Sequence, residues 1–312
     1  MCHYASLAIS NSTRRTYSAG ERRYLGFCTI CKWDPLPASD FMLSAFVAHI
    51  AGRVKPGTVR VYLAAVRNLH LDLGMPDPTA DAVLLPRVTK GVSRAHSPGL
   101  SRPRLPITAT VLRQLVHVLL GSQAPIIDRF MLHAAMLLAF HGCLRCGEFT
   151  TPADYDHRKH ATRGDIVVDA EGMQFRLKTS KTDPYGKGTT VVVGTCEPPM
   201  CATAAMRTYL ATSAGTQQDP LFRYKDGRPL SKSAFVDEIR RLLESASIAN
   251  ASNYSGHSFR IGAATSAAVA GAPDWQIRAM GRWKSDSVLR YIRHDSTAMK
   301  SLARLLTSSL HI

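Results

Sequence analysis

Four short segments of the chain carry side chains of the types that phosphate chemistry uses. They are residues 143–148 (CLRCGE), 178–183 (KTSKTD), 256–260 (GHSFR) and 281–293 (GRWKSDSVLRYIR). Among them are guanidinium groups that can clamp anionic oxygens, groups that can transfer protons, and a phenol that can act as a nucleophile. Singly, each segment has an ordinary explanation as a surface ion pair, a solvated turn or a core position. Their order and spacing together indicate a catalytic site.

In this order the segments resemble the tyrosine recombinase family, which includes the phage integrases, the Xer resolvases and the Cre recombinase. The resemblance covers residues 108–310 and, more faintly, the N-terminal part. It is strongest over 255–306, where Ser-Gly-His-Ser-x-Arg, an Ala-rich helix, Gly-x-Trp and Tyr-Ile-Arg are similar to Cre. The motif Gly-Arg-Trp-Lys-Ser-Asp is also similar to sequences of recombinases from eukaryotic mobile elements. The resemblance implies a site-specific DNA recombinase or integrase.

The family's chemistry implies a role for each matched residue. Tyr291 attacks a DNA phosphodiester and leaves a 3′-phosphotyrosine and a free 5′-hydroxyl. Arg145 and Arg260 clamp the non-bridging oxygens, which gain negative charge in the transition state. His257 lies one helical turn before Arg260 and either aids removal of the proton or donates a hydrogen bond to an oxygen. Trp283 occupies a position that the family fills with His or Trp, where its ring packs and its N–H donates one hydrogen bond.

The leaving 5′-oxygen needs a proton, which in this family comes from a lysine on a β-hairpin. Lys181, in Ser-Lys-Thr, is the first choice, and Lys178 is the alternative. Glu148 matches an acidic family position and is expected to orient the site. No metal or other cofactor is expected, because the arginines supply the positive charge, and no ATP is needed, because the phosphotyrosine conserves the bond energy.

The chain departs from the usual family pattern at one place. Trp283 and Tyr291 are eight residues apart, whereas most members have nine. On a helix one residue corresponds to about 100° of rotation, so the preceding loop must absorb the difference. Arg282, beside Trp283, has no role assigned by the resemblance.

Two other functions remain as alternatives. A type IB topoisomerase shares the nucleophile and the arginine clamp, but the Cre-like segment after Tyr291 argues against it. A DNA-binding protein that keeps the fold without catalysis is the other alternative, and the full set of candidate residues argues against that.

The charge of the chain independently indicates a polyanionic partner. Its 39 basic and 23 acidic residues give a net charge of +16. Double-stranded DNA is the expected partner. A membrane role is not expected, since no apolar run approaches the roughly 18 residues of a spanning helix, and Met1–Ser12 does not read as a secretory signal. The protein is expected inside the cell with DNA, in the nucleus or the cytoplasm according to the host.

Seven cysteines form no disulfide framework by count or spacing. Two Cys-x-x-Cys pairs, Cys28/Cys31 and Cys143/Cys146, invite a zinc interpretation. More than 100 residues separate the pairs, and both lie in apolar, helix-like context. Buried free thiols are therefore the better interpretation.

The sequence predicts two domains. Residues 1–85 are expected to form an all-helical DNA-binding (core-binding) domain, with Arg60 and Arg67 on a phosphate-contacting helix face. Residues 86–106, rich in proline and glycine, are predicted to be an extended linker. Residues 107–312 are predicted to be the catalytic domain, and the two domains are expected to clamp duplex DNA.

The predicted fold class is mainly α with a small antiparallel β-sheet. Strand-like runs occur at 165–169, 173–177 and 189–194, and the segments around them have helical periodicity, including 285–293 with Tyr291. After Tyr291, the leucines of 297–310 lie on one helical face. The family resemblance implies that this helix docks on a neighbouring copy in a DNA-bound tetramer.

Overall fold

The computed structural model describes residues 8–96, 104–180, 183 and 186–293. The chain divides into two compact units, Met1–Ser101 and Arg102–Ile312. No helix among the described residues is long and apolar enough to cross a membrane.

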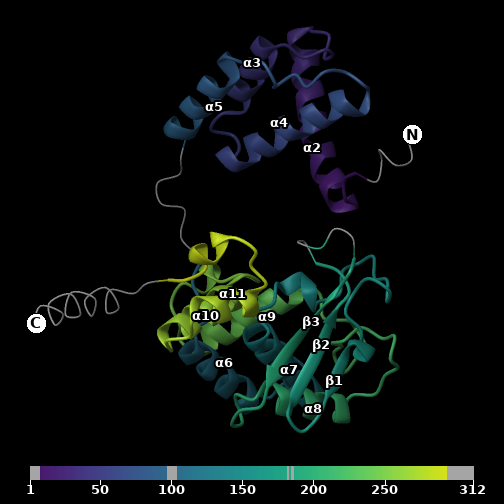
Figure 1. Cartoon of the computed structure of the whole chain (residues 1–312), viewed down its shortest axis with the longest axis vertical. Helices are drawn as coiled ribbons and strands as arrows, with labels where there is room; N and C mark the ends of the chain where they lie inside the picture. The colour runs from purple at the N-terminus through teal and green to yellow at the C-terminus, as the bar shows by residue number, and fades with distance from the viewer. Residues whose placement is uncertain (1–7, 97–103, 181–182, 184–185, 294–312) are drawn as a thin grey trace, which may run out of the picture. The chain divides into compact units, whose positions relative to one another are not determined.

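The described elements of the first unit are four helices around a small apolar core (Figure 1). They are α2 (Asn11–Cys31), α3 (Asp40–Ile50), α4 (Pro56–Asp72) and α5 (Leu84–Ala95). Ser39 caps α3 by accepting the Met42 amide, and a proline begins α4, where its missing N–H costs nothing. Tyr24 and Phe46 are buried edge to face at the centre of this core.

The helix α5 corrects the predicted linker, because residues 86–95 are helical rather than extended. Pro86 lies in the first turn, where a backbone N–H is not required. The cap comes from Asp40, whose carboxylate accepts the amides of Val83, Leu84 and Leu85 at 2.7–2.9 Å. These hydrogen bonds, led by that from Leu84, lower the pKa of Asp40. A capping group more than 40 residues away could not be recognised from the local sequence.

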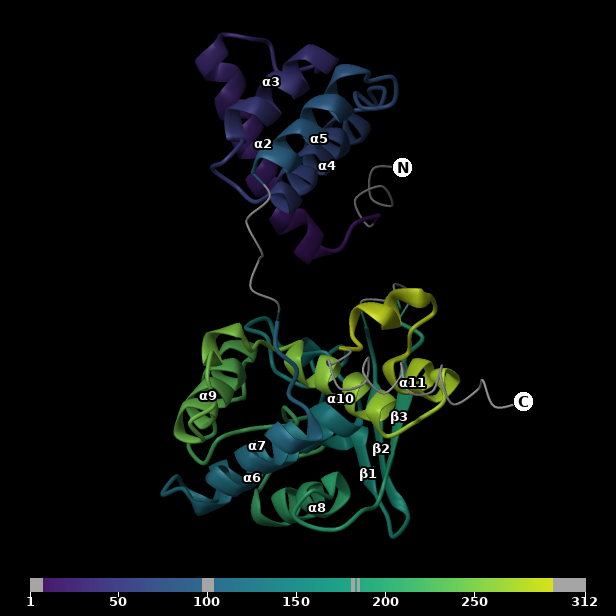
Figure 2. The same ribbon diagram turned by 90° about the vertical axis from the view of Figure 1, so that its left-hand side faces the viewer.

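The second unit combines helices with one small sheet (Figures 1 and 2). Its elements are α6 (Ala109–Gly121), α7 (Ile126–His141), η1 (Cys146–Glu148), η2 (Arg163–Asp165), β1 (Ile166–Val168), β2 (Gly172–Leu177), β3 (Thr189–Gly194), α8 (Ala202–Thr212), α9 (Lys232–Ser245), η3 (Ala251–Asn253), α10 (Ser258–Val269), α11 (Asp274–Gly281) and η4 (Asp286–Arg290). The three strands are antiparallel in the order β1-β2-β3. A mainly helical fold with a small antiparallel sheet is thus confirmed.

Helix α7 forms the centre of this unit, because residues 131–140 are all buried. A helix that is apolar on every side is stable only when other elements surround it. Contacts join α7 to α6, α8 and α10, and α8 also contacts β1 and β3. The C-terminal end of α7 is therefore a fixed point from which the residues that follow it are positioned.

The segment before Tyr291 differs from the predicted helix over 285–293. It is a short 3₁₀ helix, η4, and Tyr291 follows it directly. The Thr265 hydroxyl on α10 donates to the Tyr291 carbonyl at 3.2 Å and accepts the Arg293 amide at 3.1 Å. These bonds from another element replace α-helical ones, a tertiary effect that the local pattern could not show.

Candidate active site

Arg145 lies just beyond the C-terminal end of α7, at the start of the short helix η1. Glu148, one turn later, accepts from the Arg145 backbone amide and from its Nη1 atom, both at 2.8 Å. The Glu148 side chain is only 5% exposed, so its carboxylate stays fixed. Glu148, in the same turn, therefore holds the Arg145 guanidinium in place.

Arg282 reaches the same carboxylate from the end of α11. Its Nη2 atom lies 2.8 Å from Glu148 Oε2, and its Nη1 atom donates to the Gly142 carbonyl at 3.1 Å. The Arg282 backbone is left-handed, with φ of 55°. That conformation costs a residue other than glycine about 1 kcal/mol and is otherwise favoured for glycine or asparagine at a helix C-terminus. Glu148 thus joins two arginines that lie far apart in the sequence.

Arg260 is completely buried in the first turn of α10. Its Nη1 donates to the Cys143 carbonyl at 2.5 Å, and its Nη2 donates to the Gly281 carbonyl. Its Nε has no hydrogen-bond partner among the described residues. Burial lowers the pKa of Arg260, and the charges of the neighbouring Arg145 and Arg282 add to that effect. A buried cation with an unused donor suits an anionic ligand.

Two aromatic rings pack against Arg260. Its guanidinium carbon lies 4.4 Å from the Trp283 ring centroid and 5.5 Å from that of Tyr291. The two rings are themselves 5.0 Å apart, centroid to centroid, so the short spacing in sequence does not separate them. Trp283 covers Gly281 so closely that a Cβ atom there would lie 1.8 Å from the indole. Glycine is therefore required for this packing.

His257 occupies the N-cap position of α10. Its Nδ1 atom is buried and has no hydrogen-bond partner within the described parts of the chain. Burial lowers the pKa of His257, and the positive charges of Arg104, Lys232 and Arg145 lower it further. The imidazole is therefore held in its neutral form, which can accept a proton.

Of the two candidate lysines, only Lys178 lies among the described residues. Lys178 forms an ion pair with the buried Asp165 at 2.6 Å and donates to the carbonyl of His157 and the hydroxyl of Thr162. Its ammonium therefore anchors the segment before β1 to the end of β2. Lys181 lies outside the described residues.

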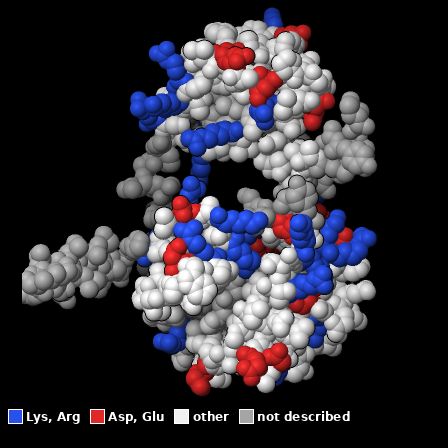
Figure 3. Space-filling view, viewed as in Figure 1, with Lys and Arg blue, Asp and Glu red and all other residues white. Residues whose placement is uncertain are grey.

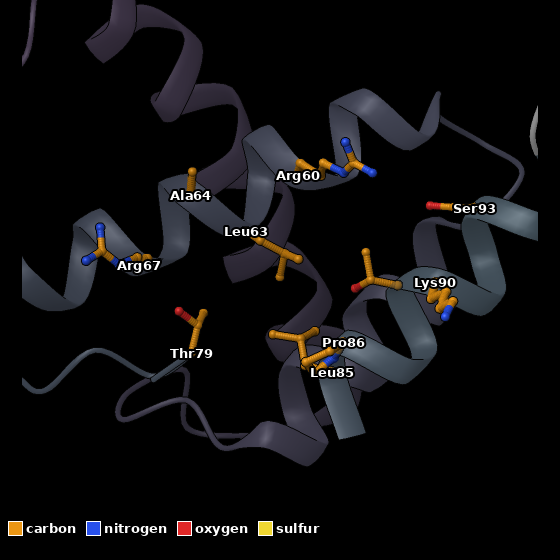
Figure 4. Close-up of a pocket in the computed structure, with 10 residues that line it drawn as sticks. Arg60, Leu63, Ala64, Arg67, Thr79, Leu85, Pro86, Lys90 and Ser93 are labelled. Atoms are coloured by element: carbon orange, nitrogen blue, oxygen red, sulfur yellow. The ribbon is translucent and has the colours of Figure 1, made fainter. Parts of the chain in front are cut away.

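Arg60 and Arg67 belong to the first unit, on α4. With Lys90 of α5 they line a groove of about 490 Å³ between the two helices, whose apolar floor includes Leu63 and Leu85 (Figure 4). Arg67 is also paired with Asp77 at 2.5 Å, an ion pair that lowers the pKa of Asp77 to about 2. The two arginines line one groove, and their contact with DNA phosphates stays a prediction.

The Cys-x-x-Cys pairs are free thiols. Burial raises the pKa of Cys143 and of Cys146 to about 11, so both stay protonated and pack as small apolar groups. Among the described residues, no group of three or more His, Cys, Asp or Glu side chains could hold a metal ion.

Within the second unit, five predicted site residues come together around Arg260: Arg145, Glu148, His257, Trp283 and Tyr291. Sequence reasoning assigned no function to two further contributors, Arg282 and Thr265. One local signal could have indicated Arg282: it is an arginine directly after Gly281, which ends a helix. Thr265 had none, since a threonine inside an apolar helix is common.

The comparisons with known proteins concern the family and the fold of the chain. The sequence pattern of the phage integrase family matches residues 106–298. A curated relative, an integrase/recombinase described as a xerD homolog from Selenomonas ruminantium, is 23% identical over 302 residues, covering 92% of this chain and 83% of the relative.

Solved structures of low identity share the fold. The XerH site-specific recombinase bound to difH substrate is 13% identical with a TM-score of 0.61, covering 93% of this chain and 78% of that one. A lambda integrase dimer bound to a COC′ core site is 14% identical with a TM-score of 0.61, covering 93% and 74%. The Tn1549 transposon integrase in complex with circular intermediate DNA is 14% identical with a TM-score of 0.57, covering 95% and 94%. Since the family pattern spans well over half of its residues, the chain belongs to the phage integrase family of tyrosine recombinases.

Proposed function

We propose that the chain is a site-specific DNA recombinase or integrase that cuts and rejoins DNA through a covalent bond between Tyr291 and a 3′-phosphate. The packing of the Tyr291 and Trp283 rings against the buried guanidinium of Arg260 carries the proposal. This packing brings a potential nucleophile beside a buried cation whose Nε donor has no partner among the described residues.

In the proposed reaction, the Tyr291 oxygen attacks the phosphorus atom and the bond to the 5′-oxygen breaks. Arg145 and Arg260 stabilise the additional negative charge of the transition state. His257 is neutral and accepts the phenolic proton. The phosphotyrosine keeps a phosphate ester bond, so the 5′-hydroxyl of another DNA end can reverse the reaction without ATP.

Lys181 is the proposed donor of the proton that the 5′-oxygen takes up. The engagement of Lys178 supports this choice, because its ammonium already faces the Asp165 carboxylate and three other oxygens. A general acid must be able to reach the leaving oxygen. Releasing Lys178 would leave a buried carboxylate unpaired, which is unfavourable.

Duplex DNA is the proposed partner of both units. In Figure 3, lysine and arginine side chains gather at the end of the second unit where α11 and the ends of β2 and β3 lie. In the first unit, Arg60 and Arg67 line a groove in which Lys90 adds a third cation. We assign DNA binding to residues 1–85 together with the rest of α5, and catalysis to residues 107–312.

A tetramer on DNA completes the proposal. Recombination joins four DNA ends, so cyclic assembly of four copies is the expected symmetry. The tail segment 297–310, proposed to dock on a neighbouring copy, lies outside the described residues. Deleting residues 297–312 tests this part, since single-site binding should persist while pairing of two DNA sites is lost.

Sequencing of DNA fragments that become covalently attached to the protein tests the proposed function. Attachment at one recurring sequence is the expected result. Attachment at scattered sequences would instead indicate a topoisomerase, and binding without attachment would indicate a DNA-binding protein that lacks catalysis.

A further inference from the structure

The carboxylate of Glu148 is shared between two arginines, and this sharing limits how Arg145 can pair. Glu148 Oε1 accepts from Arg145 Nη1, whereas Oε2 accepts from Arg282 Nη2, both at 2.8 Å. Within the described residues, the Arg145 side chain donates to Glu148 through Nη1 alone. The remaining guanidinium donors of Arg145 are thus left for another acceptor.

We propose that Arg282 is a positioning residue for the catalytic Arg145, acting through Glu148. The inference rests on the proposed function. Arg282 and the Arg145 backbone amide share Oε2, so the Glu148 carboxylate reaches the Arg145 guanidinium through Oε1 alone. It also neutralises a carboxylate that would otherwise repel the phosphate. The three arginines and Glu148 leave a net positive site for the phosphate.

The placement of Arg282 supports a dedicated role. Its side chain is only 16% exposed and spans from the end of α11 to the end of α7, where it also bonds the Gly142 carbonyl. Its φ of 55° is a conformation that glycine adopts without strain.

Without Arg282, we expect Glu148 to exchange the bond from the Arg145 backbone amide for a second bond from the Arg145 guanidinium, so that both of its oxygens pair with that side chain. Bidentate pairing would draw Arg145 donors away from the phosphate. Glu148 would also keep a negative charge near the reacting group. Arg282→Ala should therefore slow covalent attachment to DNA by roughly tenfold or more, a smaller effect than the ~10²-fold or greater loss on removing a clamp residue outright.

Compensation distinguishes this role from a merely structural one. Adding Glu148→Gln to Arg282→Ala removes the unbalanced charge, so the double variant should recover most of the lost rate. Arg282→Lys keeps the charge and one hydrogen bond, and should also retain most of it. In a background that combines Arg145→Ala with Glu148→Gln, neither the guanidinium nor the carboxylate charge remains, so Arg282→Ala should change the rate by less than about twofold.

Arg129→Ala is the matched control. Arg129 is also partly buried and donates to a backbone carbonyl, that of Leu120, but it lies at the opposite end of α7. Its loss should leave the rate of attachment unchanged. A full additional loss from Arg282→Ala in the background of Arg145→Ala with Glu148→Gln would overturn the proposal and indicate that Arg282 binds the phosphate itself.

A measurement without turnover separates this inference from the proposed function. In the full chain labelled with ¹⁵N-arginine, the Arg145 side-chain resonance, assigned through Arg145→Lys, should shift in Arg282→Ala. It should return toward its original position when Glu148→Gln is added. An unchanged Arg145 resonance in Arg282→Ala refutes the positioning role, whether or not the protein attaches to DNA. If the resonance shifts while the wild-type protein forms no adduct, the proposed function fails alone.

Discussion

The guanidinium carbon of Arg260 lies 4.4 Å from the centroid of the Trp283 ring. Both residues are buried, and the same guanidinium donates to the carbonyl of Gly281, two residues before the tryptophan. A cation over an aromatic face is stabilised by the ring quadrupole, more strongly where water is excluded. The contact joins the first turn of α10 to the end of α11, and it fixes the ring against which Tyr291 packs.

Gly281→Ala should disrupt this relationship. A Cβ atom would lie 1.8 Å from the Trp283 ring, so the indole must move away from Arg260. Overpacking of this kind lowers the free energy of unfolding by about 1–3 kcal/mol. We expect denaturant titration to show that loss, with slower covalent attachment to DNA. Gly121→Ala is the control, since a Cβ there meets nothing within 4 Å; equal behaviour of the two variants would contradict the packing argument.

The two lysines should separate by chemical rescue. Lys181→Ala should block cleavage of ordinary DNA but cleave a substrate whose 5′-bridging oxygen is replaced by sulfur, a leaving group that needs no proton. Lys178→Ala should instead leave the buried Asp165 unpaired and destabilise the fold by about 3 kcal/mol. Single-turnover cleavage and thermal unfolding of both variants check this. Rescue of Lys178→Ala alone would show that Lys178 is the acid.

The pH dependence of covalent attachment should report His257. Burial lowers its pKa from the ordinary 6.5, so the imidazole remains neutral as the pH falls through that value. The rate should hold through pH 6.5 and decline only at lower pH. Because the pKa of His257 is lowered, the neutral imidazole contributes fully to the free energy of unfolding above pH 6.5. That contribution is lost as the pH falls through the lowered pKa. His257→Gln should slow attachment by about 10²-fold and remove this decline; a decline that persists in this variant would exclude His257 as its source.

The candidate catalytic residues could be named from the sequence because their types and order are local signals, whereas the residues that support them could not. The ends of β3 and α11 follow from strand alternation and from Gly281. The cap that Asp40 gives to α5, the Thr265 bonds that shape η4, and the contact of Arg282 with Glu148 all join distant segments. Such contacts depend on the folded chain, so no spacing rule could reveal them.

DNA affinity should fall steeply with salt. Each phosphate neutralised contributes about 0.9 to the slope of log affinity against log salt concentration. Arg60→Ala and Arg67→Ala should each reduce the slope, with a smaller effect for Arg67 because Asp77 already pairs with it. Arg228→Ala should leave the slope unchanged. Arg228 pairs with Asp226, and the loop that carries both residues is hydrogen-bonded to Asp128 in the first turn of α7, away from the residues around Arg260. Filter binding at several salt concentrations measures these slopes. Equal slopes in all variants would show that Arg60 and Arg67 do not contact DNA phosphates.

Trapping of the covalent adduct tests the central claim most directly. A nicked duplex that loses its 5′-hydroxyl fragment after cleavage prevents resealing, so the protein stays attached to DNA and migrates slowly under denaturing conditions. The wild-type protein should form this adduct in the presence of EDTA, because arginines supply the positive charge. Tyr291→Phe removes one oxygen and should bind the same DNA with unchanged affinity while forming no adduct. An adduct that persists in Tyr291→Phe would contradict the assignment of Tyr291 as the nucleophile.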